Sequence, residues 1–191
     1  MKMLSFLMQD SLVQVSSSNT GDVNKDLIVS RLNYIKSQEN FEWVYSHKVH
    51  YLNIPISFDI ETSSFYEGVA KKAIMYIWTC NVNGTTFIGR TWKQFTQFID
   101  IMSEVFELIK YNKRCLIYVH NLEYEFQFMR KWFEWHDIFA DDKRQPLYAV
   151  TNSGVEFRCS YRLSGYSLNN IRVRKWWEIW IIHLSDIPIH R

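Results

Sequence analysis

Two carboxylates stand two residues apart near the end of an apolar stretch. Residues 56–62 read Ile-Ser-Phe-Asp-Ile-Glu-Thr, with apolar and polar side chains in alternation. This period of two predicts a strand on which Asp59 and Glu61 project from the same face. Neighbouring carboxylates repel each other unless a hard cation lies between them, so the pair is a candidate ligand set for Mg²⁺ or Mn²⁺. An ordinary solvated strand end is the alternative interpretation.

A second candidate stretch begins about sixty residues further on. Residues 116–128 read Leu-Ile-Tyr-Val-His-Asn-Leu-Glu-Tyr-Glu-Phe-Gln-Phe, which predicts a short buried strand followed by a helix. Glu123 and Glu125 fall in the first turn of that helix, where the helix dipole alone favours acids. If this strand ends beside the first one, the carboxylates gather at one sheet edge. Such a group suits two-metal phosphodiester hydrolysis, in which the ions clamp the attacking and leaving oxygens.

The elements that must position these carboxylates predict an α/β fold with a mixed sheet. Asn83-Gly84 is a strong hairpin signal, and Thr91 is a good helix N-cap. Residues 63–72 are expected to form a turn region. Strands are expected at residues 54–61, 73–81, 85–89, 116–119, 146–151 and 155–161, and helices at residues 92–111 and 123–136.

Composition sets further bounds on the chain of 191 residues. It is 47% hydrophobic, which is ample for a packed core, and its net charge of +2 neither demands nor opposes a nucleic-acid partner. The three cysteines form no C-x-x-C pair, so we expect reduced core residues of an intracellular, cytoplasmic protein. No apolar run is long enough to span a membrane, so no membrane partner is expected. Residues 1–51 carry no recognisable chemistry and are expected to be a poorly ordered extension with a weak helix at residues 26–37. A tail or an arm that docks a partner is the alternative.

Both candidate stretches resemble motifs of a known family. Residues 58–62 are similar to the Exo I motif of the proofreading 3′→5′ exonuclease domain of family B DNA polymerases, and His120–Glu125 is similar to Exo II. Ser167-Leu168-Asn169-Asn170-Ile171 is similar to a Ser/Thr-Leu-x-x-apolar motif that protein-primed members from phages and linear plasmids carry before Exo III. The resemblance implies the N-terminal exonuclease portion of a viral DNA-directed DNA polymerase, with a ribonuclease-H-like fold.

The resemblance also implies roles for individual residues. Asp59, Glu61 and Glu125 would be the catalytic metal ligands of a two-metal Mg²⁺ or Mn²⁺ site, although the family usually has Asp at the position of Glu125. The 3′ end of single-stranded DNA would be held by Thr62, Asn121, Tyr124, Phe128, Ser167 and Leu168. Aromatic faces suit this task because they stack on bases without reading sequence. Phe128 as plain core and Ser167 as a helix cap are the alternatives. In the full family enzyme, a terminal protein primer is a further partner.

The sequence departs from the family after Ile171. The Exo III motif, a Tyr-x-x-x-Asp helix, is missing, and so is the polymerase palm. The tail at residues 176–191 is rich in tryptophan, which fits a buried helix, a tail that binds a partner or a membrane surface, or a one-base frameshift near Lys175. Read one base earlier, residues 176–182 can encode Met-Val-Gly-Asp-Leu-Asp-Tyr, similar to a stretch that precedes Exo III. The expected organisation is an extension at 1–51, an incomplete exonuclease domain at 52–175 and an atypical tail.

Three functional readings therefore remain open. The first is an exonuclease portion whose activity is incomplete. The second is a non-catalytic module that binds single-stranded nucleic acid. The third is a free-standing ribonuclease-H-like nuclease whose last acid is supplied by Asp137, Asp141 or Asp142, which are expected in a loop after the second helix.

Overall fold

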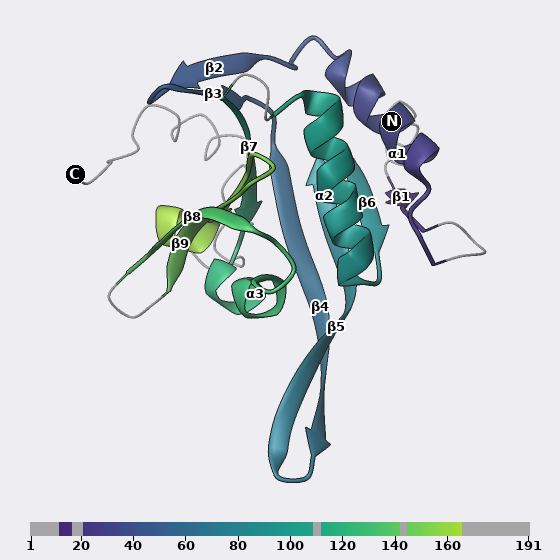
Figure 1. Ribbon diagram of the computed structural model, residues 1–191, viewed down its shortest axis with the longest axis vertical. Helices are drawn as coiled ribbons and strands as arrows, with labels where there is room; N and C mark the ends of the chain where they lie inside the picture. The colour runs from purple at the N-terminus through teal and green to yellow at the C-terminus, as the bar shows by residue number, and fades with distance from the viewer. Residues whose placement is uncertain (1–11, 17–20, 109–111, 142–144, 166–191) are drawn as a thin grey trace, which may run out of the picture.

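A computed structural model of the chain describes residues 12–16, 21–108, 112–141 and 145–165. These residues form an α/β structure in which one large mixed sheet is flanked by helices (Figure 1). The described elements are β1 (Leu12–Gln14), α1 (Lys25–Lys36), β2 (Trp43–Ser46), β3 (Val49–Leu52), β4 (Ile56–Glu67), β5 (Ala70–Val82), β6 (Thr85–Gly89), α2 (Trp92–Phe106), β7 (Lys113–Val119), α3 (Leu122–Met129), β8 (Trp135–Ala140), β9 (Pro146–Thr151), β10 (Val155–Cys159) and α4 (Ser160–Ser164).

The main path of the sheet runs β1-β6-β5-β4-β7-β10-β9-β8, and β3 adds to β7 beside it. The strands β4, β7 and β10 are parallel neighbours, whereas β5 is antiparallel to both β4 and β6. The carboxyl ends of parallel neighbours meet at the same edge of a sheet. The topology therefore brings the carboxyl ends of β7 and β10 to the level of Phe58 on β4, which itself continues to Glu67.

Helix α2 covers one face of the sheet and fixes the orientation of β4. Its start is defined by a capping box between Thr91 and Gln94, as the N-cap prediction required. Phe95 on α2 stacks on Phe58 of β4, with 4.3 Å between ring centroids. Because side chains alternate along a strand, burying Phe58 and Ile60 against the core turns Asp59 and Glu61 toward the opposite face.

The N-terminal segment differs from the expected extension. Strand β1 pairs with β6, and β3 pairs with β7, so both belong to the sheet. Val13 and Ile28 are buried in the same hydrophobic core as β4 and α2. The apolar residues of this segment are too irregularly spaced for the sequence alone to predict that its strands pair with β6 and β7, far along the chain.

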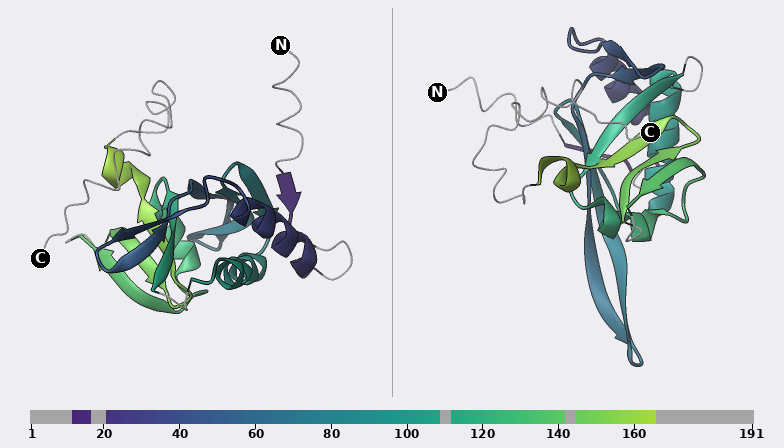
Figure 2. Two further views of the ribbon diagram at one scale, coloured as in Figure 1. Left: turned by 90° about the horizontal axis from the view of Figure 1, so that it is seen from above. Right: turned by 90° about the vertical axis from the view of Figure 1, so that its left-hand side faces the viewer.

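The expected turn region at residues 63–72 is wrong. Strand β4 continues to Glu67, Gly68 turns the chain with a φ of 62°, and β5 returns from Ala70. Residues 62–76 thus form a two-stranded projection, here called the arm, that extends away from the rest of the molecule (Figures 1 and 2). The strand pattern was obscured because both faces of the arm are exposed, so apolar and polar residues do not alternate along it.

The second half of the fold was predicted with one substantial error. The hairpin across Asn83-Gly84 is confirmed, and so is the β9–β10 hairpin. Helix α3 ends at Met129 instead of residue 136, and β8 follows it, so Asp137 lies on a strand instead of a loop. Asp141 follows the end of β8, and Asp142 lies outside the described residues.

Two compositional expectations can be compared with the structure. Cys80, Cys115 and Cys159 are all buried free thiols, and burial raises the pKa of the Cys115 thiol. The expectation of reduced core cysteines is confirmed by their placement. Within the described ranges, every helix is too short or too polar to cross a membrane.

Candidate active site at the carboxyl ends of the parallel strands

Three segments far apart in the sequence meet where β7 and β10 end beside Phe58 of β4. Phe58 of β4 pairs with Val119 of β7, and Val119 pairs with Cys159 of β10. The next residue along each chain segment is therefore Asp59, His120 and Ser160, respectively. Parallel pairing in this register places Asp59 of β4 at the same level as the first residue after β7 and the first residue after β10.

Asp59 and Glu61 are exposed on β4, as the alternation predicted. The pKa of Asp59 is raised above its usual value, chiefly by partial desolvation of the carboxyl group. The backbone amide of Ile60 and the nearby His120 act in the opposite direction, while Glu61 raises the pKa further. Asp59 therefore lies within electrostatic reach of both Glu61 and His120.

Glu125 is the most unusual side chain of the site. The buried face of α3 consists of Leu122, Glu125 and Met129, at the three- and four-residue spacing of a helical stripe. A carboxyl group thus occupies the middle of an apolar stripe and is only 5% exposed. Its Oε2 atom is buried and makes no hydrogen bond within the described structure. Such a group is costly unless a proton or a cation compensates its charge.

The surroundings of Glu125 favour the protonated carboxyl. Its pKa is raised to about 7, chiefly by burial and also by the charge of Asp59. Its backbone hydrogen bond opposes this shift. The electrostatic coupling shows that Glu125 on α3 and Asp59 on β4, separated by more than sixty residues, share one local environment.

His120 is a site residue that the sequence reasoning quoted but did not single out. Burial lowers its pKa, and the neighbouring Asp59 carboxylate partly restores it. Ser160 Oγ lies 3.4 Å from its Nδ1, and the Tyr161 ring packs edge-on against the imidazole with 5.8 Å between centroids. The parallel pairing of β7 with β10 creates these contacts, and no local sequence pattern signals such a pairing.

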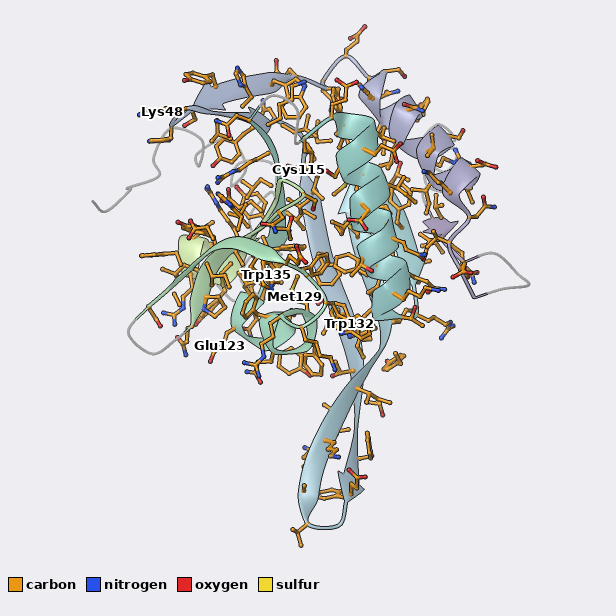
Figure 3. The ribbon with its side chains drawn as sticks, in the orientation of Figure 1. Lys48, Cys115, Glu123, Met129, Trp132 and Trp135 are labelled. Atoms are coloured by element: carbon orange, nitrogen blue, oxygen red, sulfur yellow. The ribbon has the colours of Figure 1, made fainter. Side chains whose placement is uncertain are left out.

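A polar and aromatic cluster borders the carboxylates. Thr62 Oγ1 and the Tyr124 hydroxyl are 2.6 Å apart, and the Tyr124 ring meets the Phe128 ring at 5.1 Å. Tyr124 is exposed, whereas Phe128 packs partly against the core. Figure 3 shows other α3 residues, Glu123 and Met129, at the end of the molecule from which the arm projects. The structure thus brings three of the expected DNA-binding residues together.

Of the other expected DNA-binding residues, the structure describes Asn121. Asn121 occupies the N-cap position of α3 and is exposed, but its side chain makes no capping hydrogen bond to a described amide. Its backbone carbonyl accepts from the amides of Tyr124 and Glu125. Ser167, Leu168 and the tail at 176–191 lie outside the described residues.

The Thr62–Tyr124 contact allows a direct test of the geometry. We expect Tyr124→Phe and Thr62→Val each to lower the free energy of unfolding by about 1 kcal/mol, because each removes one partner of a hydrogen bond. The double variant should lose less free energy of unfolding than the two single variants together. The difference, measured by urea unfolding, should be about 0.5–1 kcal/mol. Strict additivity would contradict the contact.

The described residues do not contain a complete metal cluster. No group of three or more His, Cys, Asp or Glu side chains among them is arranged to hold a metal ion. The carboxylates that interact most closely by charge are Asp59 with Glu61 and Asp59 with Glu125. In the described part of the chain, these carboxylates therefore lie within charge interaction of one another without forming a three-ligand group.

Comparison with known proteins adds no assignment. No protein-family model and no curated protein matches this sequence. The chemistry of the sheet edge must therefore be inferred from its own residues.

Proposed function

We propose that this chain is a 3′→5′ exonuclease domain of the kind found in protein-primed family B DNA polymerases, acting on the 3′ end of single-stranded DNA. The observation that carries the proposal is Glu125, a carboxyl group buried in an apolar stripe, with one unpartnered oxygen and charge coupling to Asp59. A purely structural helix would gain stability from an apolar residue at this position.

The order of the strands supports this proposal. The central strands β6-β5-β4-β7-β10 include an antiparallel β5 beside three parallel neighbours, an arrangement compatible with a ribonuclease-H-like fold. Under the proposal, Exo I lies on the central strand β4 and Exo II at the junction of β7 and α3. Their carboxylates then share the sheet edge by topology alone.

The residues present fit a hard divalent cation. Mg²⁺ in enzymes is commonly held by one or two carboxylates, with water and substrate phosphate completing its shell, so a complete protein cage is not required. Asp59 and Glu125 would hold the ion, with Glu61 beside them. The unpartnered Oε2 of Glu125 is the observation that supports this assignment. A bound Mg²⁺ or Mn²⁺ would supply Lewis-acid stabilisation of charge on the phosphodiester.

The remaining residues of the site would position the DNA. Tyr124 and Phe128 offer aromatic surface for the terminal bases, and the Thr62 hydroxyl can reach sugar or phosphate oxygens. Hydrolysis would join a water oxygen to the terminal phosphorus and break the bond to the 3′ oxygen of the preceding nucleotide, which then takes up a proton. The product would be a mononucleotide.

A second candidate function is binding of single-stranded nucleic acid without cleavage. It is favoured by the raised pKa of Glu125, about 7, and by the absence of a three-ligand metal group among the residues described. A site that stays partly protonated and incompletely liganded could hold a strand without hydrolysing it.

A degradation assay separates the two candidates. The full chain is incubated with single-stranded DNA labelled at its 5′ end, with Mg²⁺, Mn²⁺ or EDTA. The proposed exonuclease shortens the strand from its 3′ end one nucleotide at a time, only with a divalent ion. Binding without shortening in any condition supports the second candidate, and neither binding nor shortening contradicts both.

A further inference from the structure

Among the described residues, the two strands of the arm at residues 62–76 form backbone ladder pairs only with each other. Strand β4 pairs with β7 only through Ser57 and Phe58, and β5 pairs with β6 only from Trp78 onward. In the described part of the chain, both outer edges of the arm therefore lack a neighbouring strand. Five large side chains on it are exposed: Phe65, Tyr66, Val69, Ile74 and Tyr76. A projection with this much uncovered aromatic surface suggests an interaction surface.

The two faces of the arm can be separated by its register. Tyr66 lies opposite Lys71 and Thr62 lies opposite Met75, so these residues share one face. Phe65 lies opposite Lys72 on the other face. Thr62 is also the residue whose hydroxyl contacts Tyr124 of α3. The face with Tyr66 and Lys71, here called the site face, therefore continues from the aromatic cluster of the candidate site, whereas the alternation along β4 places Phe65 on the face that carries Asp59 and Glu61.

The charges on the two faces are not equivalent. On the opposite face, here called the back face, Lys72 forms an ion pair with Glu67, which the alternation of the strand places on that side. The site face of the arm carries Lys71 and no carboxylate. Tyr66 beside it is 73% exposed. An exposed ring opposite an uncompensated lysine is the combination that binds single-stranded nucleic acid, with stacking on bases and attraction to phosphate.

We propose that the site face of the arm is a track for single-stranded DNA that leads away from the candidate active site, with Tyr66 and Lys71 as its outer contacts. This inference rests on the proposed function, because it names where the strand held at Tyr124 continues. The distance from Thr62 to Tyr66 along the strand is about 13 Å at about 3.3 Å per residue. This matches about four stacked nucleotides at about 3.4 Å each.

The track makes binding depend on strand length. A strand of about four nucleotides fills only the site at Tyr124 and Phe128, whereas one of about twelve also reaches Tyr66 and Lys71. Stacking on one aromatic side chain and one phosphate contact together should improve the affinity for the longer strand about tenfold.

The test uses the full chain, fluorescent oligothymidylates of these two lengths, and EDTA to prevent cleavage. The Tyr66→Ala, Lys71→Ala double variant should bind the longer strand about tenfold more weakly and the shorter strand within about twofold of the unchanged protein. It should also reduce the slope of log Kd against log salt by about 0.7, the value for one phosphate contact to a single strand. The matched control is Phe65→Ala, Lys72→Ala on the back face, which should change neither affinity.

Each remaining outcome overturns the proposal in a different way. Equal losses of affinity for the longer strand in the two double variants would show that the two faces do not differ in DNA binding. An unchanged affinity in the site-face variant would show that the strand does not follow this face. A dimer of the unchanged protein that either variant dissociates would identify a second copy as the occupant. Retained binding of the short strand in these cases would leave the proposed function intact, whereas absence of binding to both lengths would contradict the proposed function itself.

Discussion

Replacing Glu125 with glutamine is expected to abolish a loss of stability that the unchanged protein shows between pH 4 and pH 8. Burial raises the pKa of Glu125 from 4.5 to about 7 in the folded state. In this pH window the folded protein binds more protons than the unfolded chain, so its free energy of unfolding falls as pH rises. A shift of this size corresponds to a destabilisation of the folded protein by about 3 kcal/mol. This destabilisation is fully present above about pH 7 and absent below about pH 4.5.

The measurement is urea unfolding of both proteins at pH 4 and pH 8. On going from pH 4 to pH 8, the free energy of unfolding of Glu125→Gln should rise by about 3 kcal/mol relative to that of the unchanged protein. Glu123→Gln is the matched control, since it makes the same substitution in the same helical turn at a half-buried position. A parallel pH profile for the unchanged protein and the Glu125 variant would show that the carboxyl is not held in its buried position.

The same variant tests whether Glu125 holds a cation. If Asp59 and Glu125 bind Mg²⁺ or Mn²⁺, the ion should stabilise the unchanged protein at pH 8, because a ligand that binds only the folded state raises the free energy of unfolding. Glu125→Gln should lose most of that stabilisation, whereas Glu123→Gln should keep it. Equal stabilisation of all three proteins would remove Glu125 from the ion site.

Replacing Asp59 with alanine is expected to have the largest effect on DNA degradation. Asp59 is the carboxylate that interacts by charge with Glu61, His120 and Glu125, so its removal takes away the centre of the site. Loss of a metal ligand should cost about 4 kcal/mol of transition-state stabilisation, which lowers the rate about 10³-fold. The rate is measured on 5′-labelled single-stranded DNA with saturating Mn²⁺.

Ser57→Ala is the matched control for this substitution. Ser57 lies two residues before Asp59 on the same exposed face of β4, so its loss should leave the rate within about twofold. Degradation that survives Asp59→Ala would place the chemistry elsewhere. If the unchanged protein binds DNA without degrading it, the binding function is favoured and Asp59→Ala should then strengthen binding, because it removes a negative charge near the phosphates.

Features that depend on neighbouring residues could be predicted from the sequence. The alternation of Ile56, Phe58 and Ile60 identified the strand that carries Asp59 and Glu61. Asn83-Gly84 specified a hairpin, because both residues adopt positive φ there. Thr91 and Gln94 specified the start of α2 through a capping box. In each case the determining interaction lies within a few residues along the chain.

Features that depend on distant contacts required the tertiary structure. Parallel pairing of β7 with β4 and β10 places His120 beside Asp59, and no local pattern encodes which strands become neighbours. The same holds for β1 and β3, which join the sheet from a segment expected to lie outside it. The outer part of the arm, at residues 63–72, was expected to be a turn region because its two exposed faces leave no apolar alternation.

Glu125 combines both kinds of information. Its sequence position already placed a carboxyl group in the first turn of a helix that begins at the end of a strand. That this carboxyl is buried, lacks a partner for Oε2 and feels the charge of Asp59 was decided only when α3 packed against the sheet. Desolvation and charge coupling depend on what surrounds a side chain in three dimensions, so the sequence determined which acids were available and the tertiary structure determined which of them share one environment.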